Sequence, residues 1–358
     1  MWADRRLLDL FEIELPIVQA PMAGAVGPEL VIAAAEAGAL GSLPCAMLTP
    51  DKAREQIGIV KQRTARPLNV NFFCHTPIAA DPRAETGWRS RLAGYYKEYG
   101  LDPDALVPSA SRSPFDEAMC AVVEDIKPKI VSFHFGLPEA KLLQRVKAAG
   151  CIVLSSATTV QEARWLEQHG ADVIIAQGAE AGGHRGMFLT DKVENQPGTF
   201  ALVPQVVDAV GIPVIAAGGI SDGRGIAAAF ALGASAVQVG TAYLKCPESI
   251  IGKPYRDGLA RADADSTAVT NLMTGKPARG IVNRVMRDIG PLSADAPVFP
   301  HAATALGPLR AAAEKAGSND FTPMWSGQAA SLAREMSAAD LTRNLAESAL
   351  LRLRQIAA

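Results

Sequence analysis

The segment Ala216-Ala217-Gly218-Gly219-Ile220-Ser221-Asp222-Gly223-Arg224-Gly225 comes late in the chain, where a short apolar run passes through two glycines into the start of a helical pattern. Glycine lets the backbone come close to an oxyanion, and the N–H groups at a helix start point at it. In a doubly wound sheet the glycine fingerprint follows the first strand, whereas a (β/α)8 barrel binds phosphate after its seventh and eighth strands. The late position of this segment therefore favours a barrel.

Short apolar runs precede and follow this segment at regular intervals, and each is about as long as a buried parallel strand, which is apolar on both faces. We predict eight strands, at Ile17–Ala23, Ala39–Pro44, Pro67–Cys74, Lys129–Gly136, Cys151–Ala157, Asp172–Gly178, Pro213–Gly219 and Ala236–Ala242. The amphipathic stretches between them predict helices at Glu29–Ala37, Pro50–Arg63, Glu139–Ala149, Val160–His169, Leu202–Val210 and Gly225–Leu232. Repeated strand–helix units imply parallel strands with right-handed crossovers. We therefore predict an α/β fold, a (β/α)8 TIM barrel, over residues 17 to 242.

Two segments interrupt this rhythm. Residues 75–113 are rich in proline and mixed charge and predict an insertion after the third strand. Residues 243–358 end in a predicted helix, Asp340–Ile356, with apolar residues at four-residue spacing. Long additions to a compact domain are usually lids or accessory domains, so we expect both segments to cap the barrel mouth. The predicted domains are a barrel of residues 1–74 and 114–242, an insertion of residues 75–113 near its mouth, and a C-terminal cap and helical tail of residues 243–358.

Charge and cysteine usage narrow the class of protein. The 35 basic and 37 acidic side chains give a formal charge of −2, so general attraction to nucleic-acid phosphates or anionic membranes is not expected. The N-terminal segment carries Asp4, Asp9, Glu12 and Glu14 where a signal peptide needs an apolar core, and no later apolar run reaches membrane-spanning length without a charge. The five cysteines are scattered, without the close pairs of a zinc site. We expect a cytoplasmic protein with reduced thiols, no metal, and no nucleic-acid or membrane partner.

The ends of the seventh and eighth predicted strands form a candidate phosphate site. Gly218 and Gly219 end one strand, and Gly240 and Thr241 end the next. The glycines allow close approach of an oxyanion, and the Thr241 hydroxyl can add a donor. We expect one phosphate here; the alternative is that the glycines only allow tight barrel turns.

A glycine-rich loop follows the sixth strand, with the sequence QGAEAGGHRG at residues 177–186. Such a backbone can lie against a flat ligand, and His184 is the only imidazole in it. Because barrel active sites are built from these loops and histidine can titrate or donate near neutral pH, we expect His184 to be functional; a structural role is the alternative. We expect Arg185 to be a solvated charge.

Three further polar positions lie at predicted strand ends. Strand alternation places His134 on the same face as Ser132 near the end of the fourth strand, where it enters the pocket or is a hydrogen-bonded core histidine. Asn71 is polar among apolar neighbours, and a buried amide without partners is costly. Together with Gln177 and the backbone at residues 22–23, it could bind the edge of a heteroaromatic ring.

These motifs together resemble the nitronate monooxygenases, formerly grouped as 2-nitropropane dioxygenases, which are FMN-dependent TIM-barrel enzymes. The matching stretches are QAPMAG (19–24), NVNFF (69–73), QGAEAGGHRG (177–186), AAGGISDGRG (216–225), QVGTAYL (238–244) and FTPMWSGQ (321–328). The resemblance implies a flavin ring lying on Pro21, Met22 and Ala23, meeting Asn71 and Gln177, and passing Gly182 and Gly183. It implies a phosphate resting on Gly218, Gly219, Gln238, Gly240 and Thr241.

The resemblance also implies an activity. An FMN enzyme of this family oxidises alkyl nitronates with O2 to a carbonyl compound and nitrite, and His184 would bind or deprotonate the nitro compound beside the flavin. His134 is the second catalytic candidate. Use of neutral nitroalkanes and the oligomeric state stay open.

The tail departs from the family pattern, and two alternatives remain. Some members place tyrosines and a lysine near the substrate, whereas this chain has Phe299, Pro300, His301 and Leu306 there and no tyrosine after Tyr255.

FMN-dependent enoyl-[acyl-carrier-protein] reductases, which use NADH, are similar in barrel and phosphate motif. A non-catalytic flavin-binding barrel is the other alternative, although it would not need His184.

Overall fold

The structure, a computed structural model, describes residues 2, 4–102, 105, 112–263 and 265–357. Eight parallel strands form one sheet in the order β1-β9-β8-β6-β5-β4-β3-β2. These are β1 (Ile17–Gln19), β2 (Gly41–Pro44), β3 (Leu68–Phe73), β4 (Ile130–His134), β5 (Ile152–Ala157), β6 (Val173–Gln177), β8 (Val214–Ala217) and β9 (Ala236–Val239). A parallel bridge between Val18 and Leu40 joins the two ends of the sheet. The predicted α/β TIM barrel and its eight strands are confirmed, although every strand is shorter than predicted.

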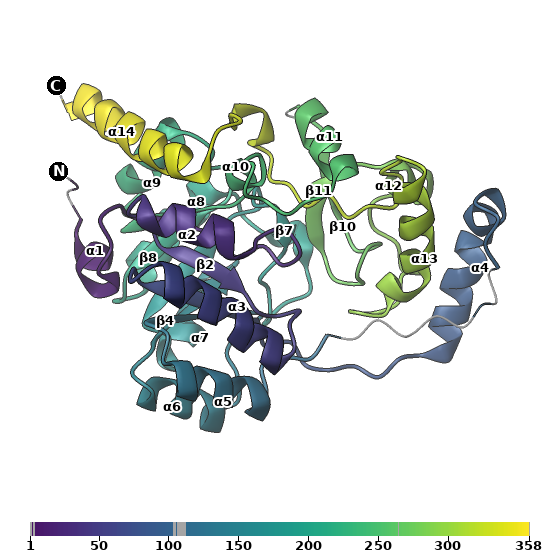
Figure 1. Cartoon of the computed structure of the whole chain (residues 1–358), viewed down its shortest axis with the longest axis horizontal. Helices are drawn as coiled ribbons and strands as arrows, with labels where there is room; N and C mark the ends of the chain where they lie inside the picture. The colour runs from purple at the N-terminus through teal and green to yellow at the C-terminus, as the bar shows by residue number, and fades with distance from the viewer. Residues whose placement is uncertain (1, 3, 103–104, 106–111, 264, 358) are drawn as a thin grey trace.

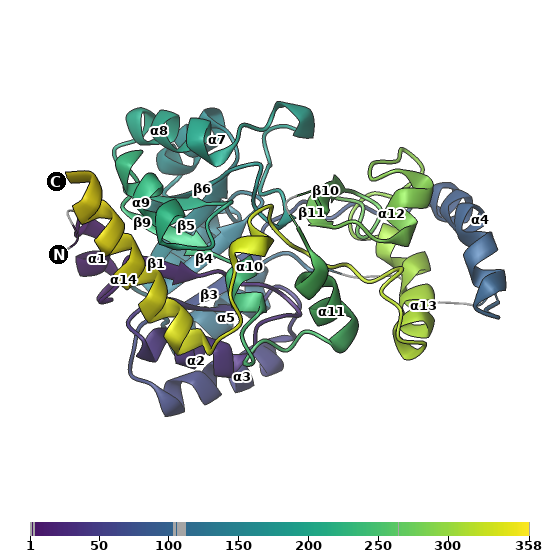
Figure 2. The same cartoon turned by 90° about the horizontal axis from the view of Figure 1, so that it is seen from above.

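Helices surround this barrel on its outside (Figures 1 and 2). They are α1 (Arg6–Phe11), α2 (Pro28–Glu36), α3 (Pro50–Arg63), α5 (Glu117–Ile126), α6 (Ala140–Ala148), α7 (Val160–Gln168), α8 (Thr199–Ala209), α9 (Gly223–Ala231) and α10 (Thr241–Leu244), with short 3-10 turns η1 (Val193–Asn195) and η2 (Ala330–Leu332). Thr49, Thr159 and Asp222 cap α3, α7 and α9 by accepting hydrogen bonds from N–H groups of the first turn. Such caps satisfy donors that have no partner inside the helix.

A small lobe lies beside one end of the barrel (Figures 1 and 2). It contains α4 (Pro82–Glu98), α11 (Lys253–Arg261), β10 (Thr267–Thr270), β11 (Ala278–Ile281), α12 (Arg284–Ile289) and α13 (Ala302–Lys315). Trp88 and Tyr96 of α4 pack in one apolar cluster with Leu306 and Leu309 of α13. The Trp88 indole N–H donates to the Ala302 carbonyl at 3.1 Å, and the Tyr96 hydroxyl donates to the Ala305 carbonyl at 2.6 Å. The predicted insertion and part of the predicted tail thus share one core.

The glycine-rich loop connects the lobe to the barrel. Its residues Gly183–His184 form β7, which pairs antiparallel with β11, so that His184 lies opposite Ala278. The loop after β6 is therefore an edge strand of the three-stranded sheet β10-β11-β7.

Residues 103–104 and 106–111 of the predicted insertion, with Pro103 and Pro108, lie outside the described residues, and the predicted domain boundaries stay a prediction.

The last helix, α14 (Ala338–Ala357), lies on the outside of the barrel against α9 and α2 (Figure 2). Its buried face includes Leu341, Leu345 and Ala349. A Cβ at Gly223 of α9 would lie 2.5 Å from the backbone nitrogen of Ala349, so the close approach of these helices requires glycine there. No helix in the described part of the chain combines the length and the apolar character needed to cross a membrane.

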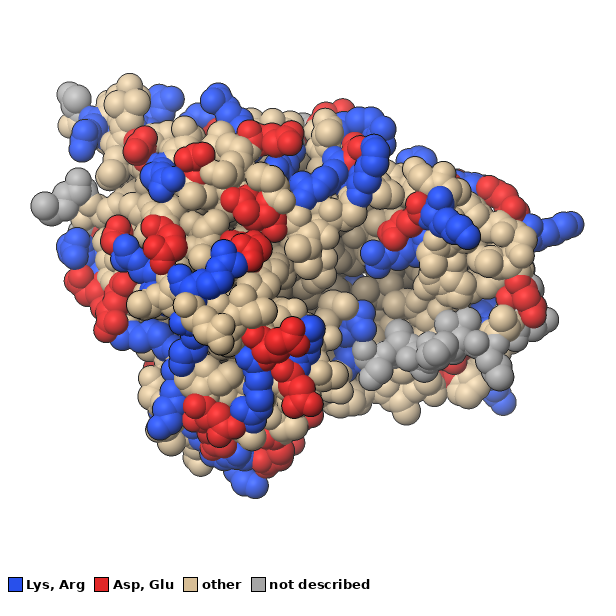
Figure 3. Space-filling view, in the orientation of Figure 1, with Lys and Arg blue, Asp and Glu red and all other residues tan. Residues whose placement is uncertain are grey.

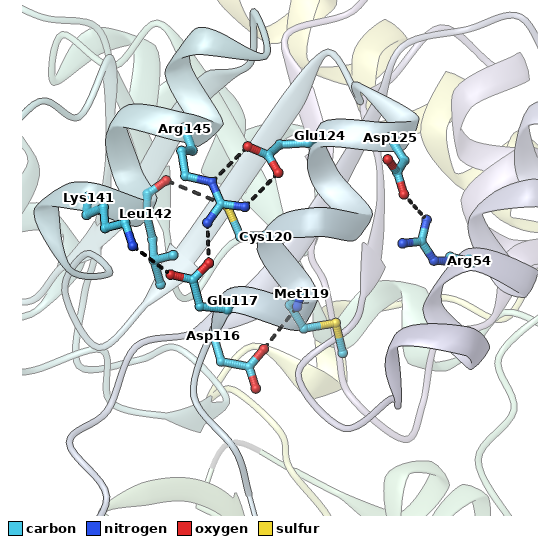
Figure 4. Close-up of polar contacts among 10 residues, drawn as sticks. All are labelled: Arg54, Asp116, Glu117, Met119, Cys120, Glu124, Asp125, Lys141, Leu142 and Arg145. Carbon is cyan, nitrogen blue, oxygen red and sulfur yellow. Dashed lines mark hydrogen bonds and ion pairs between the residues drawn. The ribbon is translucent and has the colours of Figure 1, made fainter.

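Ion pairs join the outer helices α3, α5 and α6 (Figure 4). The Arg145 guanidinium of α6 donates to both carboxylate oxygens of Glu124 on α5, at 2.8 and 2.7 Å, and also contacts Glu117. Arg54 of α3 pairs with Asp125 at 2.6 Å. Exposed pairs of this kind contribute little individually, so we assign them to helix alignment and not to function.

Candidate active site

One cavity of about 550 Å³ lies between the carboxyl ends of the barrel strands and the small lobe. Its volume is in the range of small-molecule and cofactor sites. Figure 3 shows the molecular surface hollowed between the barrel and the small lobe. Every residue predicted to bind the cofactor or to act in catalysis lines this cavity: Pro21, Met22, Ala23, Asn71, His134, Gln177, Gly182, Gly183, His184, Gly218, Gly219, Gln238, Gly240 and Thr241. Their roles stay predictions.

The glycines after β8 form a backbone cradle in the cavity wall. Gly218 and Gly219 have φ values of +115° and +70°, which side chains rarely adopt. A Cβ at Gly218 would also lie 3.0 Å from the backbone nitrogen of Ala181. This wall therefore presents backbone and not side chains to the cavity.

Two polar side chains beside the cradle are suited to a ligand. The Oε1 atom of Gln238 is buried without a hydrogen-bond partner among the described residues. An unpaired buried oxygen is costly, so a ligand that offers a donor fits this position. The Thr241 hydroxyl oxygen accepts a hydrogen bond from the Gly327 backbone N–H at 2.9 Å, which ties the 321–328 segment to the barrel.

The two amides hold their surroundings in place. The Asn71 Nδ2 donates to the Ser132 hydroxyl at 3.0 Å and to the Ser132 carbonyl at 3.2 Å. The Gln177 Nε2 donates to the His184 carbonyl at 3.0 Å, while its Oε1 accepts from the Gly186 N–H at 2.7 Å. Gln177 thus spans the glycine-rich loop, and each amide retains hydrogen-bonding capacity toward the cavity that it lines.

Arg185 is buried, and the prediction that it is a solvated charge was wrong. Its side chain donates to the carbonyl oxygens of Gly178 at 3.0 Å, Ala181 at 2.5 Å, Gly182 at 3.3 Å and Gly183 at 2.9 Å. Three of these carbonyls lie in the loop before β7 and the fourth in β7 itself, and buried carbonyl groups need donors. The guanidinium has five N–H donors in a fixed plane and can satisfy several of them at once. Arg185 therefore determines the shape of the loop.

His184 is held from both its backbone and its ring. Its carbonyl accepts from the Gln177 amide and from the His134 Nε2–H at 3.1 Å. Its own Nε2 lies 2.9 Å from the Thr274 hydroxyl oxygen, and no described residue hydrogen bonds to Nδ1. The rings of Phe73, Phe135, Phe299 and Trp325 surround it, with centroids at 6.2, 6.0, 5.7 and 5.4 Å.

His134 has both ring nitrogens engaged within the protein. Its Nε2–H donates to the His184 carbonyl, and its Nδ1 lies 3.0 Å from the Ser156 hydroxyl, from which it accepts. This pattern is the neutral tautomer with the proton on Nε2. No ring nitrogen of His134 is left for a substrate in this arrangement.

The cavity keeps its histidines uncharged. Burial, as the largest cause, together with the neighbouring basic groups His134, Lys276, Arg185 and Arg112, lowers the pKa of His184 to about 3. Burial is also the main cause that lowers the pKa of His134 to about 4. Both imidazoles are thus neutral at pH 7, in surroundings that carry positive charge and suit an anionic ligand.

The lowered pKa values predict a loss of stability in mild acid. Between pH 6.5 and pH 4 the unfolded chain binds protons at His184 and His134, whereas the folded protein does not. The free energy of unfolding therefore has its full value above pH 6.5. It falls as the pH is lowered, by up to about 1.4 kcal/mol per pH unit for each ring. We expect the urea midpoint to decrease from pH 7 to pH 5, and to decrease less in a His134→Gln/His184→Asn double variant. An equal decrease in both proteins would contradict this account.

The sequence analysis missed several residues of the site. Thr274, Phe299 and Arg112 line the cavity, and Lys276 lies with its amine 4.7 Å from the centroid of the Phe135 ring. No spacing in the chain connects the 274–276 turn with the barrel loops. Phe299 was noted only as a departure from the family, and it now contacts the His184 ring.

A barrel of eight parallel strands with a glycine cradle, two amides and a half-buried histidine at the carboxyl ends of its strands defines a TIM-barrel enzyme. The sequence profile of the family described as nitronate monooxygenase matches residues 4–348. The chain belongs to the nitronate monooxygenase family, whose members use a flavin.

Similar proteins cover nearly the whole chain. A nitronate monooxygenase of Paraburkholderia phytofirmans is 45% identical over 343 residues, which are 95% of this chain and 94% of that protein. The crystal structure of a nitroalkane oxidase from Streptomyces ansochromogenes is 40% identical with a TM-score of 0.89, and the match covers 98% of this chain and 99% of that one. The structure of FabK from Thermotoga maritima is 30% identical with a TM-score of 0.76, covering 100% and 99%.

Proposed function

We propose that this protein is an FMN-dependent nitronate monooxygenase, which oxidises alkyl nitronates with O2 to a carbonyl compound and nitrite. The observation that carries the proposal is the neutral His184 beside a glycine cradle, in a cavity with surrounding positive charge. A nitronate is an anion with its charge on oxygen, so it fits these surroundings. Family membership supports the same activity.

The residues of the cavity fit FMN. We assign the phosphate to the backbone at Gly218, Gly219 and Gly240 and to the Thr241 hydroxyl, and a hydroxyl of the cofactor to the unpaired Gln238 Oε1. We assign the ring to residues 21–23 together with Asn71, Gln177, Gly182 and Gly183. When bound, FMN would supply the redox chemistry that takes electrons from the organic substrate and passes them to O2.

His184 acts as the base toward a neutral nitroalkane. The Nε2 of His184 faces the Thr274 hydroxyl, whereas no described residue hydrogen bonds to Nδ1, so Nδ1 is the nitrogen that accepts the α-proton of the substrate. The pKa of His184 is low in the protein alone, but the negative charge that forms on the nitro group raises it in the complex. The positive side chains of Lys276 and Arg112 stabilise the nitronate, and a preformed nitronate needs no proton transfer.

His134 has a positioning role in this proposal. Its ring links Ser156 to the His184 carbonyl and has no nitrogen left for the substrate. We therefore assign catalysis to His184 and the alignment of its backbone to His134.

The wall opposite the barrel sets the space for the substrate. It is apolar at Phe299 before α13 and at Ala303, Leu306 and Gly307 of α13, and it carries the charged Arg310 and Glu314 farther along that helix. No atom lies within 4 Å of a Cβ built at Gly307, so this side of the cavity is open. The wall thus receives the carbon chain of the substrate, while His184 meets the nitro group.

The alternatives have weaker support. Similarity to FabK is lower, at 30% identity, than the 45% identity to a nitronate monooxygenase. An enoyl reductase would take hydride from NADH, and no G-x-G-x-x-G stretch follows a strand to mark a nicotinamide site. The side chains of Gln177, His134 and Thr274 all contact His184. A non-catalytic flavin-binding barrel would have no need of these three contacts.

Anaerobic mixing of the purified yellow protein with substrates tests the function. Propionate 3-nitronate, ethyl nitronate, NADH and NADPH are added separately, and flavin absorbance is followed. We expect bleaching by a nitronate alone and, in air, formation of nitrite. Bleaching by NADH at a competent rate without any response to nitronates would instead support the enoyl reductase, and flavin without any turnover would support the binding barrel.

The cofactor assignment predicts FMN and not FAD, because the glycines after β8 and β9, with Thr241, form one candidate phosphate site. We expect FMN on extraction, and Thr241→Val should weaken FMN binding by about 1–3 kcal/mol because it removes the hydroxyl donor. Thr241→Ser retains that hydroxyl and is the matched control. Recovery of FAD, or equal FMN affinity in all three proteins, would remove this assignment.

A further inference from the structure

The turn Thr274-Gly275-Lys276 brings a hydroxyl from the small lobe to the ring of His184. The Thr274 Oγ1 lies 2.9 Å from the His184 Nε2, although the two residues are 90 positions apart in the chain. Gly275 has φ +90°, and a Cβ there would lie 2.2 Å from the Pro297 carbonyl oxygen and 2.5 Å from the Phe299 nitrogen. The turn is packed against this backbone so closely that its position, and that of Thr274, is determined.

The hydrogen bonds of the Thr274 hydroxyl define where the His184 proton lies. A hydroxyl has one hydrogen to donate and two lone pairs to accept with. Its oxygen is 3.4 Å from the Lys276 carbonyl, to which it donates, and 3.5 Å from the Lys276 N–H, from which it accepts. The remaining lone pair faces the His184 Nε2. All three capacities are used only when Nε2 carries the proton.

We propose that Thr274 is a positioning residue that holds His184 in the tautomer with the proton on Nε2 and the lone pair on Nδ1. This inference rests on the proposed function for its kinetic consequence, because only a base needs that lone pair. The aromatic rings around His184 restrict where its ring lies, but among the described residues none of these rings makes a hydrogen bond to it. The choice therefore comes from a residue of the small lobe.

Kinetics of the holoenzyme test the consequence. Thr274→Val keeps the shape and removes the hydroxyl, and Thr274→Ser restores it. With nitroethane we expect kcat to fall about 10- to 100-fold in Thr274→Val, by analogy with the loss found when the hydrogen-bond partner that orients a metal-binding histidine is removed. We expect recovery to within about threefold in Thr274→Ser, and a smaller loss in both variants with ethyl nitronate, which needs no deprotonation.

Nitrogen NMR of the holoenzyme tests the tautomer without using activity. The protein is labelled with 15N-histidine, and the His184 signals are assigned among the five histidines with the His184→Asn variant. We expect the pattern of a neutral ring protonated at Nε2 in the wild type and in Thr274→Ser, and a shift toward Nδ1 protonation in Thr274→Val.

The outcomes separate this inference from the proposed function. A wild-type ring protonated at Nδ1, or an unchanged His184 spectrum together with unchanged nitroethane kinetics in Thr274→Val, would overturn the role of Thr274. If the wild type oxidised no nitronate or nitroalkane, the proposed function would fail, while the NMR comparison would still decide whether Thr274 selects the tautomer.

Discussion

Replacing His184 by asparagine should lower the turnover of a neutral nitroalkane by about 10²–10⁴-fold, the usual contribution of a general base. FMN should stay bound, because the glycine cradle and Thr241 lie on other loops. Asparagine offers no lone pair of comparable basicity, so proton removal fails. The loss with a preformed nitronate should be smaller. Steady-state rates with nitroethane and ethyl nitronate, together with the flavin content of each protein, give the measurement.

Two other histidines serve as controls. His169 is exposed at the end of α7, where its ring stacks on Trp165 at 3.9 Å, so His169→Asn should keep the wild-type rate. His134→Asn should have an intermediate effect, because it disturbs the Ser156 hydroxyl and the His184 carbonyl but not the His184 ring. A loss equal to that of His184→Asn would make the site a two-histidine pocket. A wild-type rate for His184→Asn with flavin retained would show that His184 is not the catalytic base.

Removing the Arg185 guanidinium should have the largest effect on the site as a structure. In Arg185→Met the carbonyls of Ala181, Gly182 and Gly183 lose the guanidinium as a donor, whereas the Gly178 carbonyl keeps the Ala181 N–H at 3.1 Å. Each buried carbonyl left unpaired costs about 1–3 kcal/mol. We expect a lower urea midpoint and at least a tenfold rise in the Kd for FMN, since about 1.4 kcal/mol corresponds to tenfold. Equilibrium unfolding and flavin titration measure both.

Matched substitutions identify the cause. Arg352→Met makes the same change on the exposed side of α14 and should alter neither quantity. Arg185→Lys should recover only part of the loss, because an ammonium has three donors and lacks the planar geometry of the guanidinium. If Arg185→Met bound FMN and unfolded like the wild type, the loop would not depend on this side chain.

The barrel and its flavin-type cavity could be predicted because their signals are local. Each buried parallel strand is an uninterrupted apolar run, and each outer helix has one apolar face, so the order of the elements follows from the chain. Glycines that need positive φ, such as Gly218 and Gly219, mark the cradle directly. In a barrel the carboxyl ends of all strands lie at the same face. Residues predicted one by one, from Pro21 to Thr241, therefore converge in one cavity.

The small lobe could not be predicted in the same way. Its core combines α4 from the insertion with α13 and Phe321 from the C-terminal third, and no periodic pattern links segments so far apart. The same limit applies to Thr274, which meets His184 only because β11 pairs with β7. The sequence analysis also treated Arg185 as an ordinary surface charge, since its four partners are backbone carbonyls that carry no side-chain signal.

The amino-acid sequence by itself therefore determined the fold class, the strand order and the group of residues at the barrel mouth, because backbone conformation and strand burial depend on neighbouring residues. Only the tertiary structure decided the surroundings of the His184 ring and its contact with Thr274, the burial of Arg185 and the origin of the opposite wall of the cavity. These properties depend on desolvation and on hydrogen bonds between segments distant in the chain, and both exist only once the two lobes are packed together.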